Sequence, residues 1–260
     1  MDRAKPLAAD GRTASQDDGP TTSVTMTACT WSGVACVITL LAGFWGLAGF
    51  IPPPSPSASG HQIAELFRAN QQRIRAGMIV SAFGCALMAP WFAALSVHIK
   101  RIEGRYSPMA YLQLGLGMIL TLEFIVPLMF WEVATFRDDR ADDLIRLIND
   151  LAWIQFVALT STVVLQALVI GTAIVMDKRD SPIFPRWAGY YTLFNVFVWC
   201  GGSFTVFFKE GLLAWNGLIA WYLPLAEFCL WLIIMTKLML RATNRMYSDQ
   251  PHDTIATSAR

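Results

Sequence analysis

The sequence predicts an all-α fold: a polytopic bundle of six transmembrane helices, with a short outer interfacial helix after the first span. Hydrophobic residues make up 55% of the 260 residues and charged residues only 15%, against about 25% charged residues in a soluble domain. The apolar residues also gather in six stretches, each longer than the roughly 20 residues that a helix needs to cross a bilayer. An integral membrane protein is therefore expected, and a disordered, coiled-coil or disulfide-stabilised secreted protein is excluded.

The six apolar stretches define one membrane domain, 28–241, between two polar tails. They cover 28–51, 76–97, 109–136, 152–176, 187–208 and 215–240. The tails 1–27 and 242–260 hold too few apolar residues to form a core, so we expect both to be disordered.

Six spans place both termini on the same side of the membrane. Thirteen Lys and Arg residues flank the spans on that side and seven on the other. Because cytoplasmic loops carry an excess of Lys and Arg, we expect both tails in the cytoplasm and the chain in the cell (inner) membrane. Tryptophans near the span ends are expected to form an aromatic belt; these are Trp31, Trp131, Trp153, Trp187 and Trp215.

Two local patterns add detail to this topology. Ser59 and Gln62 have the spacing of a helix capping box, and an apolar face of Ile63, Leu66 and Phe67 follows them. This pattern predicts the outer interfacial helix. Small residues at helical spacing predict close helix packing in the first two spans; they are Gly43, Gly46 and Gly49, and Gly77, Ser81 and Cys85.

Two glutamates near the middle of their spans are the main functional candidates. Glu123 precedes Pro127 by one helical turn, and Glu227 follows Pro224 by three residues. Ionisable residues at this depth are costly and often functional. No Lys or Arg lies at their level, so we expect at least one carboxyl to be protonated at pH 7. Gln166 and Asn195, which are also central, complete a candidate proton or substrate site.

The carboxyls allow two interpretations of different classes. If they titrate or bind a solute, the protein is a small-solute transporter or permease-like protein. If they only hydrogen-bond neighbouring helices, they stabilise the bundle, and the protein is a non-catalytic partner or scaffold for another membrane protein or enzyme. Association with a second copy of the chain stays open in both interpretations.

Several other classes of protein lack support in the sequence. The three histidines lie outside the spans or at their edges, and the five cysteines form no metal-binding pair. No hydrolase, nucleotide-binding or metalloprotease motif occurs, so no catalytic residue, metal or cofactor is expected. A net charge of +1 provides no basic field for nucleic acid. The expected surroundings are the lipid bilayer.

A resemblance accompanies these residues. The stretches 49–56, 148–153, 184–190 and 214–217, among them Phe184-Pro185-Arg186-Trp187, resemble a group of uncharacterised bacterial six-span integral membrane proteins. The resemblance implies six spans over most of 28–241 and implies no activity.

Overall fold

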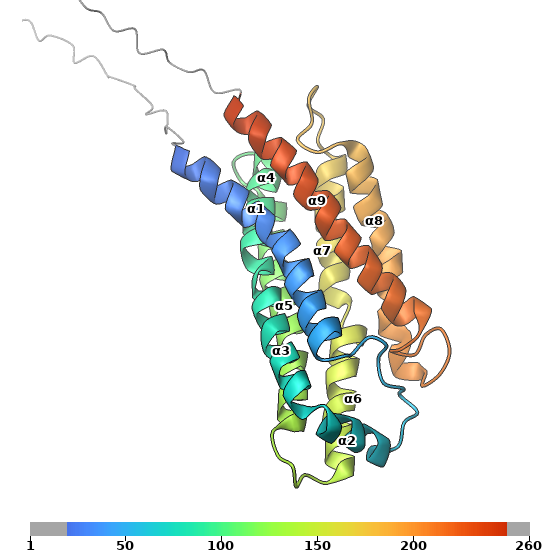
Figure 1. Ribbon diagram of the computed structural model, residues 1–260. Helices are drawn as coiled ribbons and strands as arrows, with labels where there is room; N and C mark the ends of the chain where they lie inside the picture. Colours follow the sequence, from blue (N-terminus) through green and yellow to red (C-terminus); the bar gives the residue numbers. More distant parts are fainter. Residues whose placement is uncertain (1–19, 249–260) are drawn as a thin grey trace, which may run out of the picture.

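A computed structural model describes residues 20–248, and all the regular secondary structure in this part of the chain is helical (Figure 1). The α-helices are α1 (Pro20–Leu41), α2 (Gly60–Ala69), α3 (Gln71–Ala86), α4 (Met88–Glu103), α5 (Pro108–Thr135), α6 (Asp142–Ala158), α7 (Ser161–Val175), α8 (Arg186–Cys200) and α9 (Leu223–Ser248). Two π-helices, η1 (Ala42–Leu47) and η3 (Leu218–Tyr222), and one 3-10 helix, η2 (Gly201–Phe207), continue or precede them.

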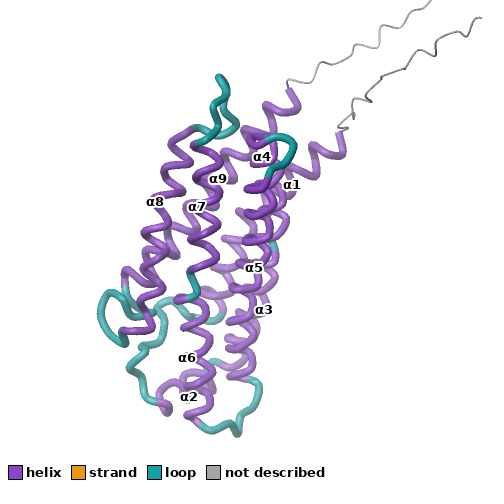
Figure 2. The backbone as a smooth tube through the Cα atoms, turned by 180° about the vertical axis from the view of Figure 1, so that it is seen from behind, coloured by secondary structure: helices purple, strands orange, loops and turns teal. Residues whose placement is uncertain are grey.

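Five of the helical segments within residues 20–248 are long and apolar enough to cross a membrane. They are Thr22–Leu47, Gln71–Glu103, Pro108–Thr135, Asp142–Val175 and Leu218–Ser248. The predicted stretch 187–208 is not among them; within it, α8 ends at Cys200 and the 3-10 helix η2 follows. Even so, α8 runs alongside α7 for much of the bundle (Figure 2).

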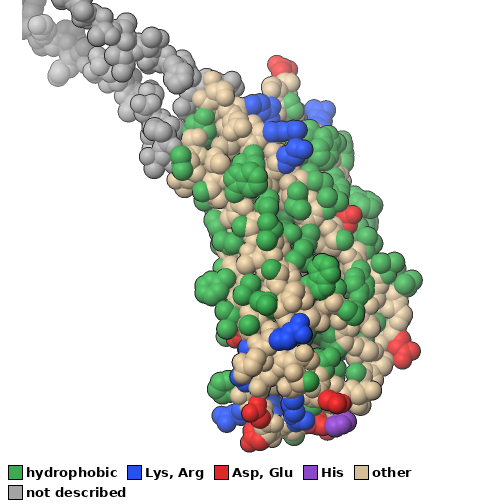
Figure 3. All heavy atoms as spheres, viewed as in Figure 1, with side chains coloured by type: hydrophobic (Ala, Val, Ile, Leu, Met, Phe, Trp, Pro, Cys, Tyr) green, Lys and Arg blue, Asp and Glu red, His purple; other side chains and the backbone are tan. Residues whose placement is uncertain are grey.

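The surface of the bundle is compatible with that of a membrane protein. Large apolar side chains such as Phe83, Leu122 and Phe197 are exposed, and hydrophobic atoms cover the middle of the face in Figure 3, with most charged side chains towards the two ends. A soluble monomer rarely exposes so large an apolar area. Such a surface is compatible with contact with lipid.

The first helix begins earlier and the last helix ends later than the apolar stretches predict. Helix α1 starts at Pro20, within the predicted tail 1–27, and α9 continues to Ser248. Met26 explains the first extension, because its side chain is buried in the core. The remaining tail residues, 1–19 and 249–260, lie outside the described part of the chain.

Only one of the two predicted small-residue faces packs as expected. A Cβ atom on Gly43 would lie 2.5 Å from the carbonyl oxygen of Gly77, so these glycines allow α3 to approach η1 closely. Gly46 and Gly49 have no such neighbour within 4 Å. The spacing of the small residues correctly predicted a close contact between the first two spans, but the contact is shorter than the spacing predicted.

The predicted aromatic belt is largely a buried core. Trp131 and Trp153 are fully buried and Trp215 is 6% exposed, whereas Trp31 and Trp187 are about half exposed. Phe44 lies between Trp131 and Trp153, with ring centroids 5.5 Å and 5.8 Å away. The prediction was wrong for these three tryptophans because span ends that pack together are shielded from lipid.

Helix α2 forms where the capping box predicted a helix. Ser59 accepts a hydrogen bond from the backbone N–H of Gln62, and the Gln62 side chain accepts one from the Ser59 backbone N–H. Ile63 and Phe67 are buried, whereas Leu66 is exposed. The helix packs on the start of α6, where Asp142 lies 2.8 Å from the guanidinium of Arg68.

Candidate functional site

Helix α6 breaks from α7 near the middle of the segment 142–175. Helix α6 ends at Ala158 and α7 begins at Ser161. The hydroxyl groups of Thr160 and Ser203 hydrogen-bond across the break. A Cβ atom on Gly202 would lie 2.3 Å from the carbonyl oxygen of Val157, so only glycine lets η2 pack against the end of α6. Serine and threonine favour such helix ends because their side chains compete for backbone hydrogen bonds.

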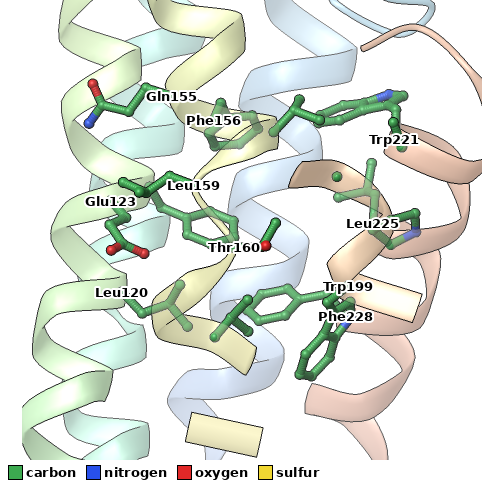
Figure 4. A pocket seen from close by; sticks show the side chains of 16 residues that line it. Leu120, Glu123, Gln155, Phe156, Leu159, Thr160, Trp199, Trp221, Leu225 and Phe228 are labelled. Atoms are coloured by element: carbon green, nitrogen blue, oxygen red, sulfur yellow. The ribbon is translucent and has the colours of Figure 1, made fainter. Parts of the chain in front are cut away.

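A small cavity of about 80 Å³ adjoins this break. This volume is large enough to hold water. Figure 4 shows Glu123 on one side, Trp221, Leu225 and Phe228 on the other, and Phe156, Leu159 and Thr160 from the break between them. No Lys or Arg lines the cavity, so no cation there balances a charge on Glu123.

Glu123 has one partnered and one unpartnered oxygen. Its Oε1 accepts a hydrogen bond of 2.5 Å from the hydroxyl of Thr162 in the first turn of α7. Its Oε2 is buried and has no hydrogen-bond partner in the described chain. Pro127, which lacks an N–H, leaves the Glu123 carbonyl without its usual partner four residues on. A carboxyl oxygen without a partner and a backbone carbonyl without its usual helical donor thus occur at one residue.

The indole groups of two tryptophans add unused donors around the same cavity. Trp199 and Trp221 both line it and are 3% and 4% exposed. Neither indole N–H has a hydrogen-bond acceptor within residues 20–248. Buried polar groups without partners are uncommon, and three of them within residues 20–248 belong to residues that line this cavity: the two indole nitrogens and Oε2 of Glu123.

Glu227 lies in a different environment. Its Oε2 accepts a hydrogen bond of 2.8 Å from the hydroxyl of Tyr191 on α8. Asn195, one helical turn after Tyr191, is fully buried, and its amide oxygen and nitrogen have no hydrogen-bond partner within residues 20–248. Glu227 is not among the residues that line the cavity.

Gln166 belongs to the side of the bundle that holds Glu123. It is 2% exposed, lies one turn after Thr162 on α7, and donates a 3.2 Å hydrogen bond to the carbonyl oxygen of Gln113 on α5. A Cβ atom on Gly117 would come within 2.9 Å of the Gln166 amide nitrogen, so a glycine makes room for this amide.

The four predicted site residues therefore fall into two groups. Glu123 and Gln166 lie between α5 and α7, and Glu227 and Asn195 lie between α8 and α9. Phe124 and Phe228, the residues after the two glutamates, stack with ring centroids 5.2 Å apart. Because successive helical residues point about 100° apart, stacking these rings turns the carboxyls towards other helices. Within the described chain, no hydrogen bond joins the two groups.

One participant, Tyr191, was not recognised from the sequence, and a second, Thr162, was not singled out from the other polar residues of the spans. No residue next to Tyr191 in the sequence indicates a functional role. However, Tyr191, Asn195 and Trp199 follow one another at intervals of four residues, which places their polar groups on one face of α8. Thr162 is one of several in-span hydroxyl residues, and only the break in the helix brings it to Glu123. The described residues contain no group of three or more metal-binding side chains.

Comparisons of the chain with protein-family models, with curated proteins and with solved structures gave no match.

Proposed function

We propose that this protein is a small-solute transporter or permease-like protein in which Glu123 is the central polar contact. One observation carries the proposal: the break between α6 and α7 lies beside a cavity that contains a half-buried carboxyl with a free oxygen. Discontinuous membrane helices often form the substrate and ion sites of transporters.

The physical reason lies in the backbone. A helix break leaves N–H and C=O groups without partners within their own helices. Within a bilayer such backbone is tolerated only where protein covers it or where it lines a cavity that water can enter. Here the cavity, the break and Glu123 lie together. This arrangement supports a site where a small polar solute or a proton changes its hydrogen-bond partner.

The topology that goes with this function has six spans, with α8 and η2 as the fifth. The first turn of α1 and the last turn of α9 lie at the same end of the bundle (Figure 1), as an even number of crossings requires. The excess of Lys and Arg at that end favours a cytoplasmic location for both termini in the cell membrane.

Flux measurements test the transport proposal. Purified protein is reconstituted into liposomes that contain a pH-sensitive dye, and acid pulses and a panel of small neutral and charged solutes are applied. We expect protein-dependent flux for a proton or at least one solute. In Glu123→Gln this flux falls to the level of protein-free liposomes. Glu227→Gln, the matched control, keeps most of it.

A second function is favoured by a different observation. Both carboxyls already accept a hydrogen bond from a hydroxyl on a neighbouring helix, as interhelical polar contacts do in bundles without transport. In a membrane partner or scaffold protein, no flux is measured and Glu123→Gln leaves every activity of its partner unchanged. Equal behaviour of the two Gln variants would support this function over transport.

A further inference from the structure

Three arginines surround one hollow at the end of the bundle where α1 begins and α9 ends. Arg101 lies in the last turn of α4, Arg179 in the loop between α7 and α8, and Arg245 near the end of α9. All three line a hollow of about 150 Å³ together with Ser181, Pro182, Ile183 and Ala242. Segments far apart in the sequence thus bring three guanidinium groups to one place.

The hollow carries a surplus of positive charge. Asp177 lies 3.6 Å from the guanidinium of Arg179, and its carboxylate is 2% exposed. This carboxylate also accepts hydrogen bonds from the backbone N–H groups of Arg179 and Ile183. It shapes the loop and offsets one of the three positive charges. No other acidic side chain pairs with these arginines within residues 20–248.

The remaining contacts of the arginines leave most of their donors free. Arg245 donates to the carbonyl oxygens of Ile183 at 2.6 Å and of Pro182 at 3.4 Å. A nitrogen of Arg101 lies 3.2 Å from Nδ1 of His98. A guanidinium has five N–H donors in a planar fork that fits phosphate oxygens. The three guanidinium groups around this hollow therefore have more N–H donors than the described residues accept hydrogen bonds from.

An apolar groove adjoins this hollow. Its walls are Pro182, Ile183, Pro185 and Leu238, its polar residues are Arg241, Asn244 and Arg245, and its volume is about 520 Å³. Pro182, Ile183 and Arg245 border both spaces. A cationic recess beside an apolar groove matches a molecule that has a phosphate at one end and a hydrocarbon chain at the other.

The depth of the site agrees with such a molecule. Arg101 is two residues from the end of the membrane-spanning segment Gln71–Glu103, and Arg245 is three residues from the end of Leu218–Ser248. Lipid headgroups lie at this level, and basic pockets between helices bind anionic headgroups there.

We propose that this site binds an anionic phospholipid, with its phosphate held by Arg101, Arg179 and Arg245 and the start of an acyl chain in the groove beside Leu238. The lipid joins α4, α9 and the α7–α8 loop. Its binding is independent of transport through the Glu123 cavity.

Thermal unfolding of the detergent-solubilised full-length protein, titrated with lipid, tests the proposal. Phosphatidylglycerol is expected to raise Tm in a saturable manner, whereas phosphatidylcholine and inorganic phosphate at the same concentration do not. In Arg245→Gln and Arg101→Gln the apparent affinity for phosphatidylglycerol falls about tenfold, because a charge-assisted, forked contact is lost. Arg105→Gln removes an arginine at the same end but outside the hollow, and it changes the affinity less than about twofold.

Two further measurements test lipid binding at this site even if a Gln variant fails to fold. Arg245→Lys retains the charge without the fork and is expected to lose about threefold in affinity. Native mass spectrometry of the wild type is expected to retain one phosphatidylglycerol and to lose it at high salt. Equal retention of both lipids, or equal loss in Arg105→Gln and Arg245→Gln, would overturn the proposal. Saturable stabilisation by inorganic phosphate alone would identify a soluble phosphate compound as the ligand instead.

Discussion

The regions around Glu123 and Glu227 begin from similar sequences and reach different structures. Each glutamate precedes a phenylalanine, has a proline nearby and accepts a hydrogen bond from a hydroxyl on another helix. Glu123 also lines a cavity at a broken helix and has an oxygen without a partner. Glu227 lies away from that cavity, in contact with Tyr191.

The difference teaches that depth in the membrane does not by itself define a polar site. A carboxyl becomes able to exchange partners when the helix opposite it is interrupted and leaves room for water or solute. The α6–α7 break supplies this room to Glu123. Beside Glu227, α8 and α9 remain helical, and the carboxyl contributes an interhelical contact.

The largest expected effect on stability comes from adding a methyl group where η2 packs against the end of α6. Gly202→Ala places a methyl group 2.3 Å from the Val157 carbonyl oxygen, so backbone must move and we expect a loss of about 2 kcal/mol or more. Gly115→Ala is the matched control, since a Cβ atom there has no such neighbour within 4 Å. It is expected to be neutral or to stabilise α5 by about 0.5 kcal/mol. Denaturant unfolding in mixed micelles measures both, and equal losses would contradict the packing of η2 on α6.

Removal of each carboxyl compares the two regions directly. Glu227→Ala leaves the Tyr191 hydroxyl without its acceptor between two packed helices, which costs about 1–3 kcal/mol. Glu123→Ala enlarges a cavity in which water can solvate Thr162, so we expect a loss about 1 kcal/mol smaller. Unfolding free energies of the two variants in the same detergent provide the measurement. A larger loss for Glu123→Ala would show that its carboxyl is the main structural contact.

The smallest effect concerns the coupling between Tyr191 and Glu227. Tyr191→Phe removes the donor and should cost about 1 kcal/mol. In a double-mutant cycle with Glu227→Ala, the two changes are expected to be non-additive by about 0.5–1 kcal/mol, because they remove the same contact. The corresponding cycle with Glu123→Ala is expected to be additive, since Tyr191 and Glu123 share no contact. Additivity in both cycles would mean that the Tyr191–Glu227 bond contributes nothing to stability.

The sequence predicted the architecture well because composition and run length decide it. Within residues 20–248, five of the six apolar stretches lie largely in helical segments long and apolar enough to cross a membrane, and the capping box at Ser59 and Gln62 located the helix α2. The breaks were not predictable in the same way. The interruption after Ala158 lies within a continuous apolar run, and it depends on contacts with Ser203 and Gly202 that are more than 40 residues away.

The candidate site was predicted in its residues but not in its grouping. Glu123 and Glu227 were identified because ionisable residues are rare near the middle of a span. The sequence alone is enough to locate them. Their separation depends on the stacking of Phe124 on Phe228, which fixes the rotation of α5 and α9. Rotation about a helix axis is set by neighbours in space. The weak amphipathic pattern of nearly uniformly apolar helices does not reveal it.

Hydrogen–deuterium exchange at the two carboxyls tests most directly whether only Glu123 faces the cavity. Infrared spectra of the purified protein at pH 7 are recorded after transfer to D2O, and the carboxyl bands are assigned with Glu123→Gln and Glu227→Gln. We predict that the band lost in Glu123→Gln shifts promptly on transfer and that the band lost in Glu227→Gln shifts much more slowly. Equal rates, or faster exchange at Glu227, would contradict the assignment of Glu123 as the exchangeable carboxyl.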